Sequence, residues 1–220
     1  MTQDLWTAVD EYLAGHVRPD ASLAAALARA VEAGLPAISV APNQGKLLYL
    51  LARICRARLV LELGTLAGYA ATWVARALPE DGRLITVEAD PKHASVARRN
   101  IADAGLADTI EVREEDALVA LTRLQREGPK PFDLVFIDAD KQRIPEYFEG
   151  SLALSRPGTV LIVDNVIRDG AVLDPDNADA SIRGVRRFHE LLATDRRVEA
   201  TTIQTVGVKG YDGFTMALVS

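Results

Sequence analysis

Cysteine, histidine and long apolar runs are scarce in this chain of 220 residues. Its single cysteine, Cys55, excludes an internal disulfide, so we expect a reducing compartment, the cytoplasm. The three histidines lie far apart and show no metal-ligand spacing. No apolar run approaches the roughly 18 residues of a membrane span, and the N-terminus lacks a basic-then-apolar pattern. Neither a membrane partner nor a secretion signal is expected.

Basic residues are fewer than acidic ones. The chain has 25 Lys and Arg against 31 Asp and Glu, which gives a formal net charge of -6. A general nucleic-acid surface needs a concentrated basic stripe, so we expect no nucleic-acid partner. Hydrophobic residues make up 49% of the chain and run through its whole length without a polar low-complexity tract. The composition therefore predicts one folded domain rather than a disordered chain.

The middle of the chain alternates between two patterns. Short apolar runs suit strands buried on both faces of a parallel sheet, and amphipathic stretches between them suit helices. The predicted strands cover 59–63, 83–88, 109–113, 132–138 and 159–164, and the predicted helices cover 68–77, 91–104, 117–126 and 142–154. This alternation predicts an open, doubly wound α/β sheet with right-handed crossovers and helices on both faces.

The two ends of the chain differ from the middle. Helices are predicted at 4–14, 21–33 and 46–56 before the first strand, and at 179–194 before two last strands at 198–205 and 213–219. The seven residues between those last strands are too few for a parallel crossover, so we expect them to pair antiparallel. No second domain is visible: residues 1–220 form one domain, with helices in 1–56 and an α/β core in 57–220.

An acidic residue stands at or just after the end of every predicted parallel strand. Ligands of open parallel sheets bind at the carboxyl ends of the strands, which makes these acids candidates for a binding site. They are Glu62, Glu88, Asp116, Asp138 with Asp140, and Asp164 followed by Asn165. Such a concentration favours positively charged ligands.

The loop after the first strand carries Gly64 and Gly68 but lacks the third glycine of a dinucleotide-binding loop. Glu62 just before it would repel a pyrophosphate and attract a cation, and Glu88 lies where an acid accepts both hydroxyls of a ribose. These residues therefore indicate a ligand that is cationic, carries a ribose and lacks phosphates, and S-adenosylmethionine (SAM) has these properties. The alternative is that the two glycines only permit a tight turn.

Asp138, Asp164 and Asn165 follow two strands expected to be neighbours. Three side-chain oxygens without His or Cys suit a hard divalent cation, Mg²⁺ first, with Mn²⁺ and Ca²⁺ also fitting the ligands. Alternatively, these residues serve only as helix caps and turn formers. Lys141 follows Asp138 by three residues, so it can lie beside the same site and take up a proton.

Five blocks in order resemble the cation-dependent O-methyltransferases, the catechol and caffeoyl-CoA O-methyltransferase-like enzymes among the small class I methyltransferases. They are VLELGTLAGYAATWVA, ITVEADPKHA, FDLVFIDADK, VDNVIRDG and TVGVKGYDGF, and the resemblance runs from about Ala37 to the C-terminus. It implies a Rossmann-like, seven-stranded, mostly parallel sheet with an antiparallel last strand. It also implies a homodimer whose N-terminal helices cover the site or form the interface.

The same resemblance implies roles for individual residues. Glu88 would bind the ribose hydroxyls, Asp140 would reach the methionine amino group, and Lys141 would be the catalytic base. The implied cofactor-binding residues are Val40 (through its backbone), Glu62, Gly64, Thr65, Gly68, Ala70, Glu88, Asp116, Ala117, Asp138 and Asp140. The implied metal ligands are Asp138, Asp164 and Asn165.

The expected acceptor is a small phenolic molecule with two vicinal oxygens, and its hydroxyl is methylated. Lys141, Arg168, Asp169 and Tyr211 are the candidate acceptor contacts, and Asp169 weakens the case for a CoA ester. Two other functions stay open. One is a non-catalytic cofactor-binding module, and the other is a nicotinamide-dependent oxidoreductase, against which Glu62 and the missing glycine count.

Overall fold

The computed structural model describes residues 2–17 and 20–220. In this part of the chain, a seven-stranded sheet has the strand order β3-β2-β1-β4-β5-β7-β6. The strands are β1 (Leu59–Leu63), β2 (Arg83–Glu88), β3 (Ile110–Glu114), β4 (Leu134–Ile137), β5 (Val160–Asp164), β6 (Val198–Gly207) and β7 (Gly210–Val219). β7 pairs antiparallel with both of its neighbours, and the β1–β5 pairs are all parallel. The predicted α/β sheet with an antiparallel last strand is confirmed.

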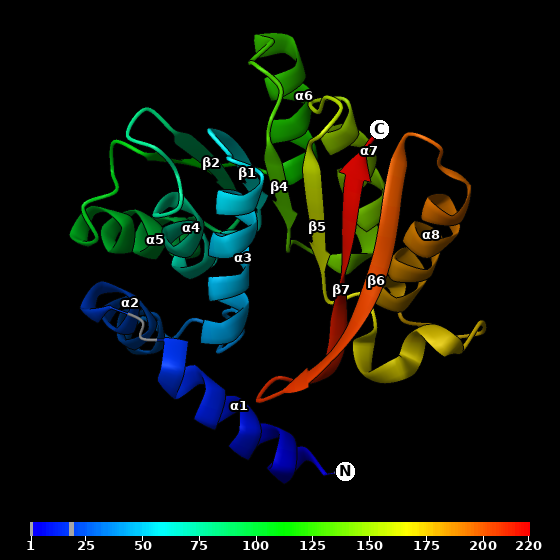
Figure 1. The fold of residues 1–220 in the computed structure, drawn as a ribbon, viewed down its shortest axis with the longest axis horizontal. Coiled ribbons are helices and arrows are strands. Elements are labelled where there is room, and N and C mark those ends of the chain that lie inside the picture. The colour runs from blue at the N-terminus through cyan, green and yellow to red at the C-terminus, as the bar shows by residue number, and fades with distance from the viewer. Residues whose placement is uncertain (1, 18–19) are drawn as a thin grey trace.

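Helices cover both faces of this sheet (Figure 1). α3, α4 and α5 pack on one face, and α6, α7 and α8 pack on the other. The helices are α1 (Gln3–Val17), α2 (Ala21–Glu32), α3 (Pro42–Ile54), α4 (Tyr69–Ala75), α5 (Pro91–Asp103), α6 (Ala117–Glu127), α7 (Ile144–Leu152) and α8 (Ala180–Thr194). Two short 3₁₀ segments, η1 (Lys141–Arg143) and η2 (Arg168–Leu173), follow β4 and β5. In the described residues no helix has both the length and the apolar character needed to cross a bilayer.

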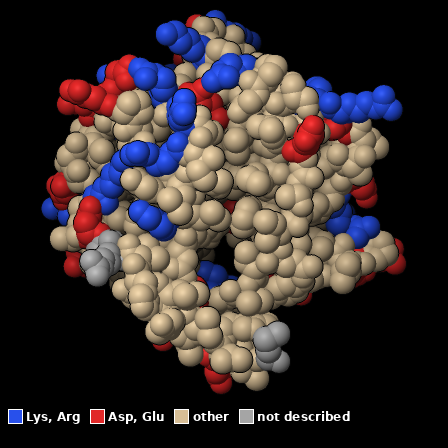
Figure 2. Space-filling model, in the orientation of Figure 1, with Lys and Arg blue, Asp and Glu red and all other residues tan. Residues whose placement is uncertain are grey.

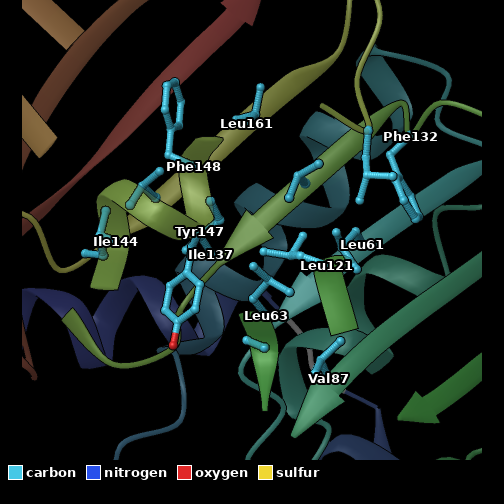
Figure 3. Close-up of a cluster of buried hydrophobic side chains, with 14 of the residues drawn as sticks. Leu61, Leu63, Val87, Leu121, Phe132, Ile137, Ile144, Tyr147, Phe148 and Leu161 are labelled. Carbon is cyan, nitrogen blue, oxygen red and sulfur yellow. The ribbon is translucent and has the colours of Figure 1, made fainter. Parts of the chain in front are cut away.

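Alternation along the strands divides the core into two layers. In β1, Leu61 and Leu63 belong to the cluster under α6–α8, whereas Val60 belongs to the cluster under α3–α5. Figure 3 shows the first cluster, in which Tyr147 lies among aliphatic side chains with its oxygen directed out of the group. Each fully buried Leu or Phe stabilises the fold by about 1.5–3 kcal/mol relative to exposure, so the strands are fixed firmly in register.

Two predicted helix starts are confirmed by their caps. Asp20 accepts hydrogen bonds from the backbone N–H groups of Ser22 and Leu23 at 3.0 and 3.1 Å. Asp90 does the same for Lys92 and His93 at 2.7 and 3.1 Å, ahead of α5. Each carboxylate satisfies donors that the first turn leaves without an intrahelical partner.

Three of the differences from the predicted bounds have a clear local cause. α3 begins at Pro42 rather than at 46, because proline suits the first turn of a helix. The predicted helix 142–154 is divided into η1 and α7, and a proline again stands in the first turn of α7. The predicted seven-residue loop is wrong: β6 and β7 extend until only Val208 and Lys209 separate them, with Gly210 at a φ of +92°.

α1 has no buried residue, although its apolar side chains are spaced so that they share one face. Leu5, Val9 and Leu13 are about half exposed, at 50%, 48% and 47%. Polar contacts join the helix to the tip of the β6–β7 hairpin: Gln3 donates to the carbonyl of Gly207 at 2.9 Å. α1 therefore lies along the outside of the molecule, below the hairpin tip (Figure 1).

Candidate active site

A cavity of about 520 Å³ opens at the carboxyl ends of β4 and β5. Its walls come from residues 37–41, the start of α3, η2 and the tip of the β6–β7 hairpin. Figure 2 shows a hollow in this region, between the N-terminal helices and the hairpin. Asp138, Asp164 and Asn165, the three predicted metal ligands, all line this cavity.

The predicted metal ligands form a polar patch on the cavity wall. Asp164 is 5% exposed and accepts a hydrogen bond from Nε2 of Gln44 at 2.6 Å. Burial raises the pKa of the Asp164 carboxyl, and the nearby charge of Asp138 raises it further, against the opposing effects of Lys141 and Gln44. A buried carboxylate beside a second acid gains from a nearby cation.

These three residues fit a hard divalent cation by the chemistry of their donors, which are two carboxylates and an amide. Within residues 2–17 and 20–220, no cluster of three or more His, Cys, Asp or Glu side chains is placed to hold a metal. The protein would therefore supply only part of a coordination shell, which leaves positions for water or an acceptor.

Lys141 lies beside the same patch. Its Nζ donates to Oδ1 of Asp138 at 2.7 Å, and its side chain is 10% exposed. Gly184 explains how α8 comes so close to this segment, because a Cβ at that position would overlap the Lys141 carbonyl and lie 2.6 Å from the Cα of Gln142. The absence of a side chain in α8 thus helps to place the lysine.

The loop after β1 has an unusual backbone. Gly64, Leu66 and Gly68 have φ values of +95°, +50° and +76°. At Gly64 a Cβ would also overlap the backbone of Asp138, so glycine is required there for two reasons. The loop therefore lies directly against the chain that carries the first predicted metal ligand.

Glu88, predicted to bind ribose, is held by this loop. Its Oε2 accepts from the N–H groups of Thr65 and Leu66 at 3.2 and 2.8 Å, and its Oε1 accepts from Asp90 at 2.9 Å. Nδ1 of His93 lies 3.7 Å from Oε1, a proximity that sequence spacing did not indicate. Glu88 is thus fixed in position by backbone donors and keeps room to accept further hydrogen bonds.

Glu62 is almost fully buried, at 1% exposure, and accepts a hydrogen bond from the hydroxyl of Thr86. Burial raises its pKa to about 8, and the charges of Asp138 and Glu88 contribute to the rise. The hydroxyl of Thr65 also pairs with Thr86. The side chain of Thr65 therefore points into the protein, so any contact of this residue with a cofactor would come from its backbone.

Arg143 is a site residue that the sequence analysis missed. Its NH1 donates to Asp116 at 2.7 Å and its NH2 donates to Asp140 at 2.7 Å, so it joins two predicted cofactor-binding acids. Tyr147 also donates to Asp140. Burial alone would raise the pKa of Asp140, but the hydrogen bonds from Arg143 and Tyr147 outweigh it and lower the pKa. The position of Arg143, three residues after Asp140, was the feature of the sequence that could have indicated this ion pair.

The hydrogen bond from Arg143 lowers the pKa of Asp116 in the folded protein. A lowered folded-state pKa stabilises the fold above the unfolded value of 3.8, and the effect is lost as pH falls through the folded value. Arg143→Met should therefore lower the free energy of unfolding by about 1 kcal/mol at pH 7, after allowance for partial exposure, and by less at pH 3, where part of the effect has been lost. Urea unfolding at both pH values measures this difference.

Arg187→Met is the matched control, because Arg187 is exposed and pairs with Glu146 at 3.3 Å. Its effect on unfolding should stay within about 0.5 kcal/mol at either pH. A loss in Arg143→Met that is equally large at pH 3 would contradict the role given to the ion pair with Asp116.

Arg168, Asp169 and Tyr211, three of the four predicted acceptor contacts, line the cavity, whereas Lys141, the fourth, lies beside Asp138 and is not part of the lining. Arg168 and Asp169 both have a φ of +54°, and Oδ1 of Asp212 accepts from the N–H of Arg168 at 3.0 Å. The hydroxyl of Tyr211 donates to Gln204. This strained turn, tied to Asp212 and thus to β7, forms one rim of the cavity.

The opposite rim comes from the N-terminal part of the chain. Val40 lines the cavity as a buried residue, and Nζ of Lys209 donates to the carbonyl of Ala37 at 2.7 Å across the opening. Asp10 of α1 lines the cavity as well and was not predicted, since nothing in the sequence indicates that α1 reaches this point. It accepts from the N–H of Val208 at 3.0 Å.

Most of the predicted cofactor-binding residues lie outside this cavity. Only Val40 and Asp138 among them line it. Glu62, Gly64, Thr65, Gly68, Ala70, Glu88, Asp116, Ala117 and Asp140 do not. They lie at the ends of β1 to β4 and the first turns of the following helices, and the side chains of Ala70 and Ala117 pack in the hydrophobic clusters. The cavity and the cofactor-side residues thus meet at Asp138.

A seven-stranded sheet with this strand order and an antiparallel β7 is the architecture of class I methyltransferases. The match to a family model narrows this class. Residues 19–219 match the family described as O-methyltransferase, and the chain belongs to that family. This membership confirms the resemblance and counts against the nicotinamide-dependent oxidoreductase.

Individual relatives agree with this family. The chain is 51% identical to a catechol O-methyltransferase of Niastella koreensis over 220 residues, which is 100% of both chains. It is 48% identical to a catechol O-methyltransferase of Mycobacterium tuberculosis, over 92% of this chain and 90% of the relative.

Solved structures are equally similar. The O-methyltransferase from Bacillus cereus in complex with SAH superimposes with a TM-score of 0.98 at 51% identity, and all of both chains is covered. The O-methyltransferase TomG from Streptomyces achromogenes, involved in tomaymycin synthesis and solved with SAM, gives 0.96 at 52% identity, covering 100% of this chain and 99% of TomG.

Proposed function

We propose that this O-methyltransferase transfers a methyl group from SAM to one hydroxyl of a small catechol-like acceptor with the help of a divalent cation. The observation that carries the proposal is the group of Asp138, Asp164 and Asn165 at one cavity, with Lys141 hydrogen-bonded to Asp138 beside it. The names of the two curated relatives support the acceptor class. The ligands of the two solved relatives support SAM.

The cofactor would lie along the ends of β1 and β2. Glu88 would accept the ribose hydroxyls, because backbone donors already fix its carboxylate. Glu62 would lie behind the cationic part of the ligand, and a positive charge there would favour the ionised form of this carboxyl, whose pKa burial raises to about 8. When bound, SAM supplies an electrophilic methyl group.

Asp138, Asp164 and Asn165 would hold the cation. When bound, it lowers the pKa of the acceptor hydroxyl. Gln44 orients Asp164 by donating to its Oδ2, and Gly64 permits the close approach that positions the Asp138 backbone. These contacts fix two of the three metal-binding residues before a cation or a substrate binds, which reduces the reorganisation that binding requires.

In its neutral amine form, Lys141 would receive the proton of the acceptor hydroxyl at Nζ and so become the ammonium. The ammonium lies beside the Asp138 carboxylate, so a proton held there is stabilised by the ion pair. General-base assistance of this kind typically contributes about 10²–10⁴ in rate. Arg168, Asp169 and Tyr211 on the rim would contact the part of the acceptor that extends from the reacting ring.

Methyl transfer to catechol, measured with Mg²⁺ and with EDTA, tests this proposal. Activity should fall at least about tenfold in EDTA and return with excess Mg²⁺, and Mn²⁺ or Ca²⁺ in its place ranks the cations. SAH should still bind in EDTA, measured by calorimetry. Activity indifferent to EDTA would overturn the role of the cation.

The test also separates the other interpretations. Binding of SAM and SAH without turnover on any vicinal diol would favour a non-catalytic module. Absence of SAM and SAH binding would overturn the whole proposal.

The proposal includes a homodimer and a cytoplasmic location, and the exposed apolar face of α1 supports the homodimer. The mass measured by light scattering tests it.

A further inference from the structure

Thr86 is a buried polar residue to which no role has been given so far. It lies in β2 directly opposite Glu62 of β1, and the two residues are paired in register. Thr86 is 0% exposed and Glu62 is 1% exposed. A hydroxyl so deeply buried between two strands must have hydrogen-bond partners, or its desolvation would destabilise the fold.

The hydroxyl of Thr86 is the middle of a chain of three side chains. It donates to Oε2 of Glu62 and pairs with the hydroxyl of Thr65, which is 4% exposed. Since the hydrogen of Thr86 points to the carboxylate, the hydroxyl of Thr65 donates to Thr86. One hydroxyl group therefore fixes both the carboxylate of Glu62 and the side chain of Thr65.

The loop that this chain anchors is also held from its other side. Glu88 accepts from the backbone N–H groups of Thr65 and Leu66. Leu66 has a φ of +50°, a conformation that is costly for a residue other than glycine and persists only where surrounding contacts impose it. The loop is therefore clamped between the two acids that lie where a cofactor would bind.

We propose that Thr86 is a positioning residue for the cofactor, whose hydroxyl holds Glu62 and the loop at residues 64–66 in the arrangement that binds SAM. The inference rests on the proposed function for its ligand, but not on the metal or on Lys141. Thr86 itself is too deeply buried to touch a ligand, so it acts through its two partners.

Thr86→Val removes the hydroxyl and keeps the shape, so it leaves the carboxylate of Glu62 and the hydroxyl of Thr65 without their shared partner. The affinities for SAM and SAH, measured by calorimetry, should each fall about tenfold or more, because buried polar groups that lose a partner relax or lose their orientation. Thr86→Ser restores the hydroxyl and should bind within about threefold of the wild type.

Thr159→Val is the matched control. Thr159 is also 0% exposed, and its hydroxyl also makes two hydrogen bonds, donating to the carbonyl of Phe132 at 2.6 Å and accepting from the N–H of Arg156 at 3.0 Å. It lies directly before the amino end of β5, and therefore on the opposite side of the sheet from the carboxyl ends of the strands, where the site lies. This variant should lower the melting temperature as Thr86→Val does, but leave SAH affinity within about threefold.

Kinetics distinguish positioning from general destabilisation. Thr86→Val should raise KM for SAM and leave kcat at saturating SAM, and KM for the acceptor, near wild type. Thr65→Val removes the hydroxyl that donates to Thr86 and should reproduce the loss of SAH affinity. It also decides the question if Thr86→Val does not fold.

The proposal is overturned if Thr86→Val or Thr65→Val, when folded, binds SAH like the wild type, or if Thr86→Ser loses as much affinity as Thr86→Val. A wild-type protein that binds neither SAM nor SAH is a different result, because it removes the proposed function itself.

Discussion

Replacing Lys141 with methionine is expected to lower kcat for catechol methylation by about 10²–10⁴ while SAM and SAH affinities stay near wild type. Methionine keeps an unbranched stem of similar length but cannot accept a proton. The hydrogen bond that Nζ of Lys141 donates, at 2.7 Å, goes to Asp138 and not to the loop at residues 64–68. Steady-state kinetics at saturating SAM and Mg²⁺, with calorimetry on SAH, measure both quantities.

The control is Lys130→Met, since Lys130 is exposed in the loop before β4. It should keep kcat within about twofold of the wild type. Turnover by Lys141→Met close to that of the wild type would show that the proton leaves by another route. A parallel loss of SAH affinity would show instead that Lys141 supports the cofactor loop.

Gly64→Ala should cause the largest loss of stability among single substitutions at the site, about 3 kcal/mol or more in urea unfolding. Two effects add: φ is +95°, and the new Cβ would overlap the carbonyl of Asp138. Because that overlap displaces the backbone of a proposed metal ligand, Mg²⁺-dependent activity should fall with stability.

Gly128→Ala separates the two effects. Gly128 has a φ of +60° at the end of α6, and a Cβ there would meet nothing within 4 Å. Only the conformational cost remains, so a loss of about 1 kcal/mol is expected. If Gly64→Ala were no more costly than Gly128→Ala, the contact with the Asp138 carbonyl would carry no weight.

The sequence predicted the sheet well where burial alone decides the structure. β1 and β2 match the predicted bounds, because continuous apolar runs between polar ends leave little choice of register. Prediction was less accurate where local geometry decides. Pro42 interrupts the apolar pattern yet begins α3, and β6 continues to Gly207 although its later residues are exposed and therefore lack an apolar signal.

The site divides in the same way. Asp138 and Asp164 could be placed on one wall because consecutive parallel strands are commonly neighbours. Gln44 could not be assigned to Asp164, since 120 residues separate them and only the packed tertiary structure brings them together. The role proposed for Thr86 could not be predicted either. In the sequence it is an ordinary strand residue, and the role depends on the register between β1 and β2.

The enclosure of the cavity has a consequence for how such enzymes can diverge. Lys209 and Ala37, 172 positions apart, meet over the opening, and Lys209 is exposed in a two-residue turn. The groups at the strand ends are buried and constrained by many neighbours, whereas this turn has few. On the function proposed above, acceptor choice would therefore change at the hairpin tip while the residues proposed for methyl transfer stay the same.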